Sequence, residues 1–405
     1  MQPPKASGAP APSRHTPDPA KVRLAMSGLF LIGLLAGGLG ALLPLWAFEL
    51  SLDSVDAGNA LMVLSVGAFV GGTGALRYGQ RNDRVRKLFL FSALAIALCL
   101  IAASQAGNAG DLVFPMAGLG LGAGAVAGLV AGLMEGCLTD RRAADVLHLS
   151  GVAFGFGAIG ACSLAWLLNG ISGSSSLLWA IAAIAVLTGL TSRRGQPVQI
   201  APIGSAVRDV ARIAWTPGGV LLAAGVFVQA ANSGIAGSWL GLYVFRKLGV
   251  SLEWSLTILI GYWATATSVR AMAVRIPERV GRVLPALAVT GIALLGALFL
   301  LQTVQASGAL AGAILLGAGA GAAHPLTLRA VRSRILPAPT GFARIYATGS
   351  FLAALGSAWA MGPISTNWGI NAVAWGLLLG VSVAFAALGL LLLESRLSHS
   401  PAGAR

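Results

Sequence analysis

Long apolar runs alternate with short polar or charged segments along almost the whole chain. The first six runs lie near 24–47, 58–77, 88–105, 112–138, 146–169 and 176–192. Six more follow a polar stretch and lie near 217–243, 254–272, 283–303, 308–331, 343–363 and 370–393. A helix of about 20 residues crosses about 30 Å of hydrocarbon, so these runs are long enough to span a bilayer. The pattern predicts an all-α polytopic membrane protein with twelve transmembrane helices.

The composition agrees with this class. Hydrophobic residues make up 56% of the chain and charged residues 10%, whereas soluble proteins average about 25% charged residues. A formal net charge of +14 would suggest a nucleic-acid partner in a soluble protein. Here the basic residues occupy the short connections between runs, where they set orientation in the membrane, so we expect no nucleic-acid partner.

The basic residues also fall on one side of the expected membrane. With the amino terminus inside, every Lys and Arg except Arg246 and Lys247 lies in a segment on the inner side. The outer loops instead carry the acidic residues Glu49, Asp53, Asp56, Asp111 and Glu253. Because Lys and Arg accumulate in cytoplasmic loops, we expect a multi-pass protein of the cytoplasmic (inner) membrane with both termini in the cytoplasm.

The chain divides into two similar halves. The offset that aligns Asp83 with Glu278 also aligns Gly122–Ala125 with Gly317–Ala320, which indicates a duplicated unit. We therefore expect two pseudo-symmetric six-helix bundles. The expected segments are a disordered cytoplasmic tail at 1–21, the first bundle at 22–192, a cytoplasmic linker at 193–215, the second bundle at 216–394 and a cytoplasmic tail at 395–405.

Small residues cluster inside the runs. The fourth run contains Gly118, Gly120, Gly122 and Gly124. A dinucleotide-binding loop would need a preceding strand, whereas small residues at these spacings let helices approach closely in lipid. The cysteines Cys99, Cys137 and Cys162 match no metal motif. We therefore expect packing roles for them, with no metal and no cofactor.

The connection between the second and third runs carries a charged motif. Gly79, Asp83, Arg84 and Lys87 fit the pattern Gly-x-x-x-Asp-Arg/Lys-x-Gly-Arg/Lys, while Arg86 stands at the second glycine position. In the second half the matching residues are Glu278, Arg279, Gly281 and Arg282, with Val274 at the first glycine position. The motif resembles the signature of the major facilitator superfamily of secondary transporters. The resemblance implies two halves that rock about a central cavity and a conformational latch formed by these residues; alternatively, the charges only fix topology.

A second resemblance lies between the fourth and fifth runs. Gly132–Leu138, followed by His148 and Phe154–Ala158, is similar to that region of the fucose- and glucose-type sugar:proton symporters. An acidic residue is common there at the position of Glu135. Ala161 replaces a proline that drug:proton antiporters often carry, which argues against drug export.

Polar groups inside apolar helices are costly in lipid, so each is a candidate site residue. The seventh run carries Gln229, Asn232, Ser233 and Trp239, of which the first three are spaced to share one helix face. Tyr262 and Trp263 follow in the eighth run, and His324 precedes a proline in the tenth. We expect these seven side chains to bind the substrate; the alternative for the amides is hydrogen bonding between helices.

Two ionisable residues are candidates for proton coupling. Glu135 is the one carboxylate placed to lie within a span, and the imidazole of His148 has an unperturbed pKa near neutrality. The first two runs carry no charged residue at mid-depth, so uniport also stays open.

These patterns predict a monomeric secondary active transporter that takes up a small, neutral, polar solute with protons, such as a sugar. Proton-driven efflux of a drug or metabolite is the alternative. A lipid-modifying enzyme would need paired carboxylates or a Cys/His cluster, which the sequence lacks, so we expect no enzyme. A sensor or scaffold that kept the fold without transporting is a third class.

Overall fold

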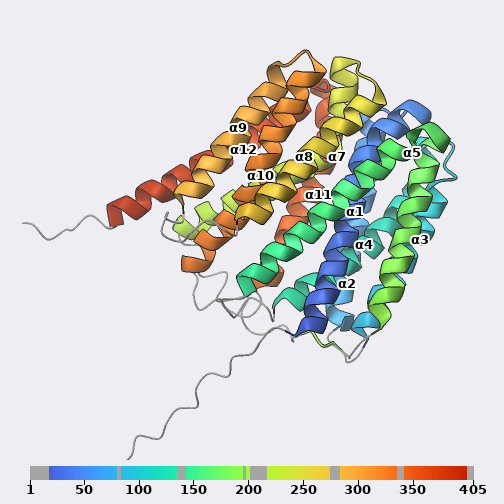
Figure 1. The fold of residues 1–405 in the computed structure, drawn as a ribbon, viewed down its shortest axis with the longest axis horizontal. Coiled ribbons are helices and arrows are strands. Elements are labelled where there is room, and N and C mark those ends of the chain that lie inside the picture. The colour runs from blue at the N-terminus through green and yellow to red at the C-terminus, as the bar shows by residue number, and fades with distance from the viewer. Residues whose placement is uncertain are drawn as a thin grey trace, which may run out of the picture.

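The computed structural model describes residues 18–79, 84–135, 143–194, 198–200, 217–273, 283–334 and 342–398. Over these residues all regular structure is helical (Figure 1). The helices are α1 (Pro19–Glu49), α2 (Ser54–Gly79), α3 (Val85–Ala103), the short 3₁₀ helix η1 (Ala109–Leu112), α4 (Val113–Glu135), α5 (Ala143–Arg193), α7 (Pro217–Leu248), α8 (Leu252–Ala273), α9 (Leu284–Gln302), α10 (Ala306–Arg334), α11 (Phe342–Trp368) and α12 (Ala372–Ser398).

Helix α5 reverses direction at Gly173 and supplies two spans. Its arms, Gly151–Ile171 and Gly173–Arg193, are each long and apolar enough to cross a membrane. Gly173 has a φ of +56°, which favours glycine, and an added Cβ there would collide with the carboxylate of Glu49. Counting both arms, the structure has a helix at each of the twelve predicted spans and confirms the predicted fold class.

Nine helical segments of the described chain meet a length and hydropathy criterion for membrane spans. The described parts of α7, α8 and α11 are not among the nine. Each of these three helices carries polar and aromatic side chains within its length. Residues of all three helices line one cavity between the bundles.

The first helix begins earlier than its apolar run. Pro19 occupies the first helical position, and the Asp18 carboxylate accepts a hydrogen bond of 2.9 Å from the Ala20 amide. Both features stabilise a helix N-terminus. Residues 19–21, expected to belong to the tail, are therefore helical, whereas most of the expected linker lies outside the described residues.

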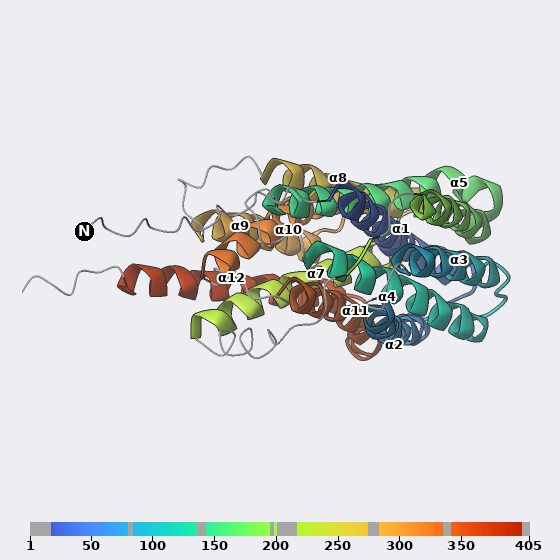
Figure 2. The ribbon, with the colours of Figure 1, turned by 90° about the horizontal axis from the view of Figure 1, so that it is seen from below.

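The helices form two bundles with the same internal arrangement. In the first, α1 packs on α5, α2 on α4, and α3 on both α4 and α5; in the second, α7 packs on α11, α8 on α10, and α9 on α10 and α12. Across the interface α5 meets α8, α2 meets α11, and α1 meets α7. Figure 2 shows α5 and α8 along one edge of this interface and α2 and α11 along the other. A two-fold rotation that exchanges the bundles would place the α5–α8 pair on the α2–α11 pair. The two bundles are therefore related by a pseudo-two-fold axis.

Glycine contacts give the register of the duplication. A Cβ at Gly120 or Gly124 would collide with main-chain carbonyl groups of α2, and a Cβ at Gly317 or Gly321 would collide with those of α8. Gly317 is thus the counterpart of Gly120, not of Gly122. The duplication is present, but the alignment of this glycine motif is two residues out of register.

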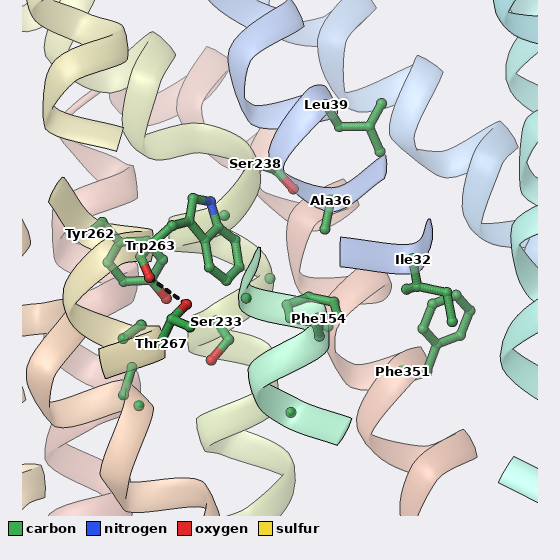
Figure 3. Close-up of a pocket in the computed structure, with 18 of the residues that line it drawn as sticks. Ile32, Ala36, Leu39, Phe154, Ser233, Ser238, Tyr262, Trp263, Thr267 and Phe351 are labelled. Atoms are coloured by element: carbon green, nitrogen blue, oxygen red, sulfur yellow. Dashed lines mark hydrogen bonds between the residues drawn. The ribbon is translucent and has the colours of Figure 1, made fainter. Parts of the chain in front are cut away.

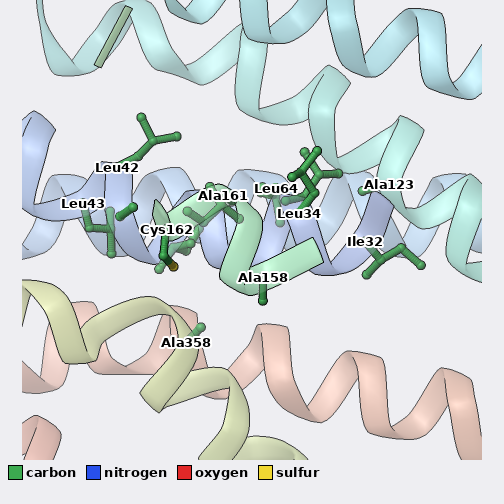
Figure 4. Packing of buried hydrophobic residues seen from close by; sticks show 14 of the residues in the cluster. Ile32, Leu34, Leu42, Leu43, Leu64, Ala123, Ala158, Ala161, Cys162 and Ala358 are labelled. Carbon is green, nitrogen blue, oxygen red and sulfur yellow. The ribbon is translucent and has the colours of Figure 1, made fainter. Parts of the chain in front are cut away.

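The core differs from that of a soluble protein because its outer face is also apolar. Leu34, Leu42 and Leu43 of α1 are fully buried among alanine and leucine side chains of both bundles (Figure 4). Large apolar side chains such as Phe114 and Leu379 are exposed on the surface, as expected for helices that face lipid.

The two bundles are joined at the end that holds the α1–α2 and α7–α8 connections. We call this the tied end. The Arg246 guanidinium donates to the Ser54 hydroxyl at 2.8 Å and to the Leu52 carbonyl, and the Asn169 amide donates to the Glu253 carboxylate at 3.1 Å. These contacts link α7 to the α1–α2 connection and α5 to α8. The first described helix begins and the last one ends at the opposite end of the molecule (Figure 1).

Candidate functional site

A cavity of ≈160 Å³ lies between the bundles. Helices α1, α2 and α5 of the first bundle and α7, α8, α10 and α11 of the second build its wall (Figure 3). Its volume is about that of an engineered protein cavity that binds benzene, so it can hold a small organic molecule. The polar, charged and aromatic side chains on the wall are Phe154, Ser233, Ser238, Tyr262, Trp263, Thr267, Arg270 and Phe351.

One face of α8 forms much of this wall. Trp263, Thr267 and Arg270 are spaced four and three residues apart, so they lie on the same side of the helix. The Trp263 ring meets Phe154 and Tyr262 edge to face, with centroid separations of 5.6 and 5.0 Å. Such aromatic pairs are stabilising beyond the area they bury, so the indole is held firmly in place.

The Trp263 indole carries a hydrogen-bond donor on the cavity wall. The side chain is 6% exposed, and its Nε1 has no hydrogen-bond partner among the described residues. In Figure 3 this nitrogen lies on the Ser238 side of the ring. A buried donor without a partner is unfavourable, so a solute oxygen that accepted this N–H would gain affinity.

Arg270 places a positive charge on the wall. It is half-buried, and its guanidinium donates to the carbonyl oxygens of Gly151 on α5 and Gly321 on α10, each at 3.4 Å. The side chain therefore reaches across the interface between the bundles. The sequence pattern assigned Arg270 to the basic residues of the inner connections. Its position on the face of α8 that carries Trp263 was the signal that could have identified it.

The structure brings together three of the expected substrate residues. Ser233, Tyr262 and Trp263 all line the cavity. The Ser233 hydroxyl donates to the Gln229 carbonyl oxygen at 3.0 Å, so it is held against its own helix. Tyr262 is almost fully buried and also borders a second cavity.

Gln229 and Asn232 lie elsewhere. Both are buried and line a smaller cavity of ≈20 Å³ inside the second bundle, beside Thr290. The Gln229 amide donates to Thr327 at 3.2 Å, and its Oε1 has no partner among the described residues. A cavity of this size has room for about one water molecule. These amides therefore sit apart from the space between the bundles.

Trp239 does not line either cavity. It is fully buried, and its Nε1 donates to the Ala358 carbonyl oxygen at 2.7 Å. The bond connects α7 to α11 within the second bundle. Because its N–H has a hydrogen-bond partner, the Trp239 indole has a packing role. The Trp263 indole, by contrast, has no hydrogen-bond partner among the described residues.

Three expected site residues have described backbones but side chains outside the described part of the chain. They are Glu135 at the end of α4, His148 in the first arm of α5 and His324 in α10. Their roles in proton coupling and substrate binding stay predictions.

The expected latch is described in part. Gly79 is buried against Leu129 and Ile200, Lys87 is exposed, and Arg84 donates to the Tyr78 hydroxyl at 2.6 Å. The remaining expected members lie outside the described residues: Asp83, Glu278, Arg279 and Arg282. The latch itself stays a prediction.

Arg86, which stands at the second glycine position of the motif, has a clear structural role. Its guanidinium donates to the carbonyl oxygens of Ser192 at 2.6 Å and Arg194 at 3.0 Å. A cation at a helix C-terminus is favourable. The substitution thus joins α3 to the end of the second arm of α5.

Two of the three cysteines lie among the described residues. Cys162 is buried, and its thiol donates to the Gly37 carbonyl oxygen at 3.4 Å; Cys99 is half-buried, and Cys137 lies outside the described residues. Within the described ranges, no group of three or more His, Cys, Asp and Glu residues is placed to hold a metal ion.

Comparison with known proteins identifies the fold. No protein-family profile and no curated protein sequence matches the chain. The chain has the fold of the major facilitator superfamily, whose two six-helix bundles enclose a cavity. Among the similar solved structures is the proton:xylose symporter XylE bound to 6-bromo-6-deoxy-D-glucose. The two share 13% identity with a TM-score of 0.66, and the match covers 92% of this chain and 94% of that one.

Proposed function

We propose that this protein is a secondary transporter that moves a small organic solute across the cytoplasmic membrane by alternating access. The observation that carries the proposal is the shared wall of the ≈160 Å³ cavity, which both bundles build. A rocking movement of one bundle against the other would open such a cavity to each side of the membrane in turn. The similarity to XylE supports this mechanism through the fold.

In this conformation the solute path is closed at the tied end. Arg246 bridges the bundles there, and an added Cβ on Gly58 of α2 would lie 2.6 Å from the Cα of Gly362 on α11. With both termini in the cytoplasm, the tied end faces outward. The structure then corresponds to a state closed to the outside.

Uptake coupled to protons is the proposed direction, with Glu135 and His148 as proton carriers. The XylE neighbour is a proton symporter. Protein reconstituted into liposomes with an imposed pH gradient should accumulate a labelled solute from a panel of sugars and small organic acids. The Glu135→Gln variant should lose the gradient dependence, whereas the control Asp56→Asn, in the first turn of α2, should keep it.

Three results would count against these proposals. No accumulation of any solute above that of empty liposomes would contradict transport. Unchanged gradient dependence in Glu135→Gln would remove this carboxylate from the mechanism. Gradient-driven extrusion in place of uptake would reverse the proposed direction and favour an antiporter.

A further inference from the structure

We infer that the solute is a small uncharged molecule that carries a carboxamide group on a compact apolar body. Its carbonyl oxygen accepts hydrogen bonds from Ser238 and Trp263, and its N–H groups donate to Ser233 and Thr267. The inference rests on the proposed transport function and narrows its substrate class. It keeps the neutral solute that the sequence patterns favoured and replaces hydroxyl groups by an amide as the group that is recognised.

Two donors without partners lie side by side at the cavity. The Trp263 N–H is buried without a partner, and no described group hydrogen-bonds the Ser238 hydroxyl. A Cβ at Gly237 would lie 2.9 Å from the Trp263 ring, so α7 packs on the indole at the residue before Ser238. Figure 3 shows Ser238 on the side of this ring that carries Nε1. A carbonyl oxygen has two lone pairs and can accept from both donors.

The indole nitrogen is not yet in contact with open space. Nε1 is closed off from water in this conformation, so a solute oxygen reaches it when the proposed movement of the bundles widens the cavity. Until then the N–H stays unsatisfied, which is unfavourable. An acceptor that enters the site therefore relieves a cost that the empty protein bears.

Two hydroxyl groups on the same wall are left as acceptors. The Ser233 hydroxyl donates its proton to the Gln229 carbonyl oxygen at 3.0 Å, and the Thr267 hydroxyl donates to the Trp263 carbonyl oxygen at 2.7 Å. A hydroxyl group has one proton and two lone pairs, so both oxygens can still accept. The Tyr262 side chain uses part of this capacity at Ser233. Solute N–H groups are the partners that fit these oxygens.

The donors and the acceptors have the same order along both helices. Ser238 lies about 7.5 Å closer to the tied end than Ser233 along α7, and Trp263 lies about 6 Å closer than Thr267 along α8, at about 1.5 Å per residue. A carboxamide carries its oxygen and its nitrogen on one carbon, and a hydrogen bond of about 2.9 Å extends from each. The group therefore spans the two levels with its oxygen toward the tied end and its nitrogen toward the opposite end.

The rest of the wall suits an apolar body. Ile32, Leu39 and Leu61 from the first bundle and Leu355 from α11 line the cavity together with the aromatic rings. Its volume of ≈160 Å³ is enough for a body of about one ring. A pentose would place several hydroxyl groups against these surfaces without partners, which opposes binding.

The wall favours an uncharged solute. No Asp or Glu is among the described residues that line the cavity. Arg270 lies at the wall but already has partners in the protein, the Gly151 and Gly321 carbonyl oxygens among them. A solute anion would have to compete with these partners and would also lose its hydration, which is costly. We therefore assign Arg270 no contact with the solute.

The test measures binding to the full-length protein in lipid nanodiscs by calorimetry, with empty nanodiscs as the blank. Benzamide, acetophenone and benzoate have the same shape, but acetophenone lacks the N–H donors and benzoate is charged. Xylose is the hydroxyl-rich probe. We expect the Kd of benzamide to be at least about threefold lower than that of acetophenone, as for a neutral hydrogen bond, and at least about tenfold lower than those of benzoate and xylose.

Three variants separate the two ends of the amide. Ser233→Ala removes an acceptor, so it should raise the Kd for benzamide at least about threefold and leave that for acetophenone unchanged. Trp263→Phe and Ser238→Ala each remove a donor to the carbonyl oxygen that both probes share. Each should therefore raise the Kd for both probes at least about threefold. A general loss of structure would not separate the probes in this way.

Two matched controls change the same residue types elsewhere. The Ser382 hydroxyl donates to the Leu378 carbonyl oxygen of its own helix, and Trp375 is exposed on the outer surface. Neither residue lines the cavity. Ser382→Ala and Trp375→Phe should leave the Kd for benzamide unchanged. The comparison of the four probes on the unmodified protein decides the question even where a variant does not fold.

The inference is overturned if benzamide does not bind, if any of the other three probes binds as tightly, or if Ser233→Ala leaves the Kd for benzamide unchanged. Transport in liposomes is read separately. Benzamide that binds with the expected variant pattern, in a protein that moves no solute, would support the amide site and contradict the proposed function. Accumulation of a sugar while benzamide fails to bind would support transport and overturn the amide site.

Discussion

Arg246 and Lys247 are neighbours in α7, yet they serve different parts of the molecule. Arg246 joins the second bundle to the α1–α2 connection of the first. The Lys247 ammonium donates to the carbonyl oxygens of Leu300 and Leu301 at 2.9 and 2.7 Å, at the end of α9. A cation at a helix C-terminus is stabilising. These two exceptions to the inner-side distribution of basic residues therefore have specific partners.

The tryptophans provide a prediction at the residue scale. Trp239→Phe should lower the free energy of unfolding by about 1–3 kcal/mol, because it leaves the buried Ala358 carbonyl without its donor. Trp375→Phe is the matched control, since Trp375 is 57% exposed on the outer surface, and it should change stability by less than about 0.5 kcal/mol. Unfolding of the purified variants in detergent measures both. Equal effects of the two changes would contradict the packing role of Trp239.

At the scale of helices, close packing depends on positions where a side chain has no room. Helix α4 lies against α2 at Gly120 and Gly124, and α10 lies against α8 at Gly317 and Gly321. In lipid such contacts replace the hydrophobic driving force that operates in water. The same device is therefore used in both bundles.

The glycine contacts yield a prediction with an internal control. Gly124→Ala should destabilise the protein by about 1–3 kcal/mol, because its Cβ would meet the main chain of α2 and force the helices apart. Gly74→Ala, on α2, meets nothing within 4 Å and should be neutral or stabilising by up to about 1 kcal/mol. Thermal unfolding of the two variants in one detergent compares them. A destabilised Gly74→Ala with an unaffected Gly124→Ala would contradict the packing.

The tied end should respond to acid through Glu253. Hydrogen bonds from the Ser251 side chain, from its own main chain and from Asn169 hold the pKa of Glu253 below its usual 4.5. The ionised carboxylate accepts these bonds, so its contribution to closure is complete above that usual pKa. The contribution is lost as the pH falls through the lowered pKa.

The effect of acid is expected to be small because Glu253 is largely exposed. Distances between spin labels at the tied ends of α5 and α8 should show a larger open population as the pH falls below the usual pKa of 4.5. Glu253→Gln should remove this pH dependence, and Asp56→Asn should preserve it. An unchanged pH response in Glu253→Gln would exclude this carboxylate as its source.

At the scale of the whole molecule, the sequence predicted the spans because a bilayer leaves little choice. Helix length and the distribution of basic residues follow from hydrocarbon thickness and loop charge. The register of the duplication was wrong for the glycine motif, because alternating glycines match equally well after a shift of two residues. The contacts of these glycines with the main chains of α2 and α8 show that Gly317 corresponds to Gly120. The periodicity of the sequence does not contain this information.

The cavity wall was harder to predict. Ser233 lines the space between the bundles, whereas Asn232, its neighbour, lines the small cavity within one bundle. Successive residues point about 100° apart around a helix, and the sequence shows that angle but not which neighbour each direction meets. Arg270 was missed for a related reason, since an arginine near a helix end has the same pattern whether it faces water or a cavity.

The proposed alternating movement can be tested by preventing it. Asn169 and Glu253 approach across the bundle interface at the tied end, so cysteines at both positions can be joined by a short thiol-specific reagent that forms disulfides. Because the proposed alternating access requires the tied end to open in each cycle, the cross-linked protein should lose solute uptake in liposomes, and a reductant should restore it. Cysteines at Ser104 and Ser175 are the matched control, because the Ser175 hydroxyl donates to the Ser104 carbonyl within the first bundle. Joining that pair should leave uptake intact, whereas full uptake by the cross-linked Asn169→Cys/Glu253→Cys protein would contradict opening at this end.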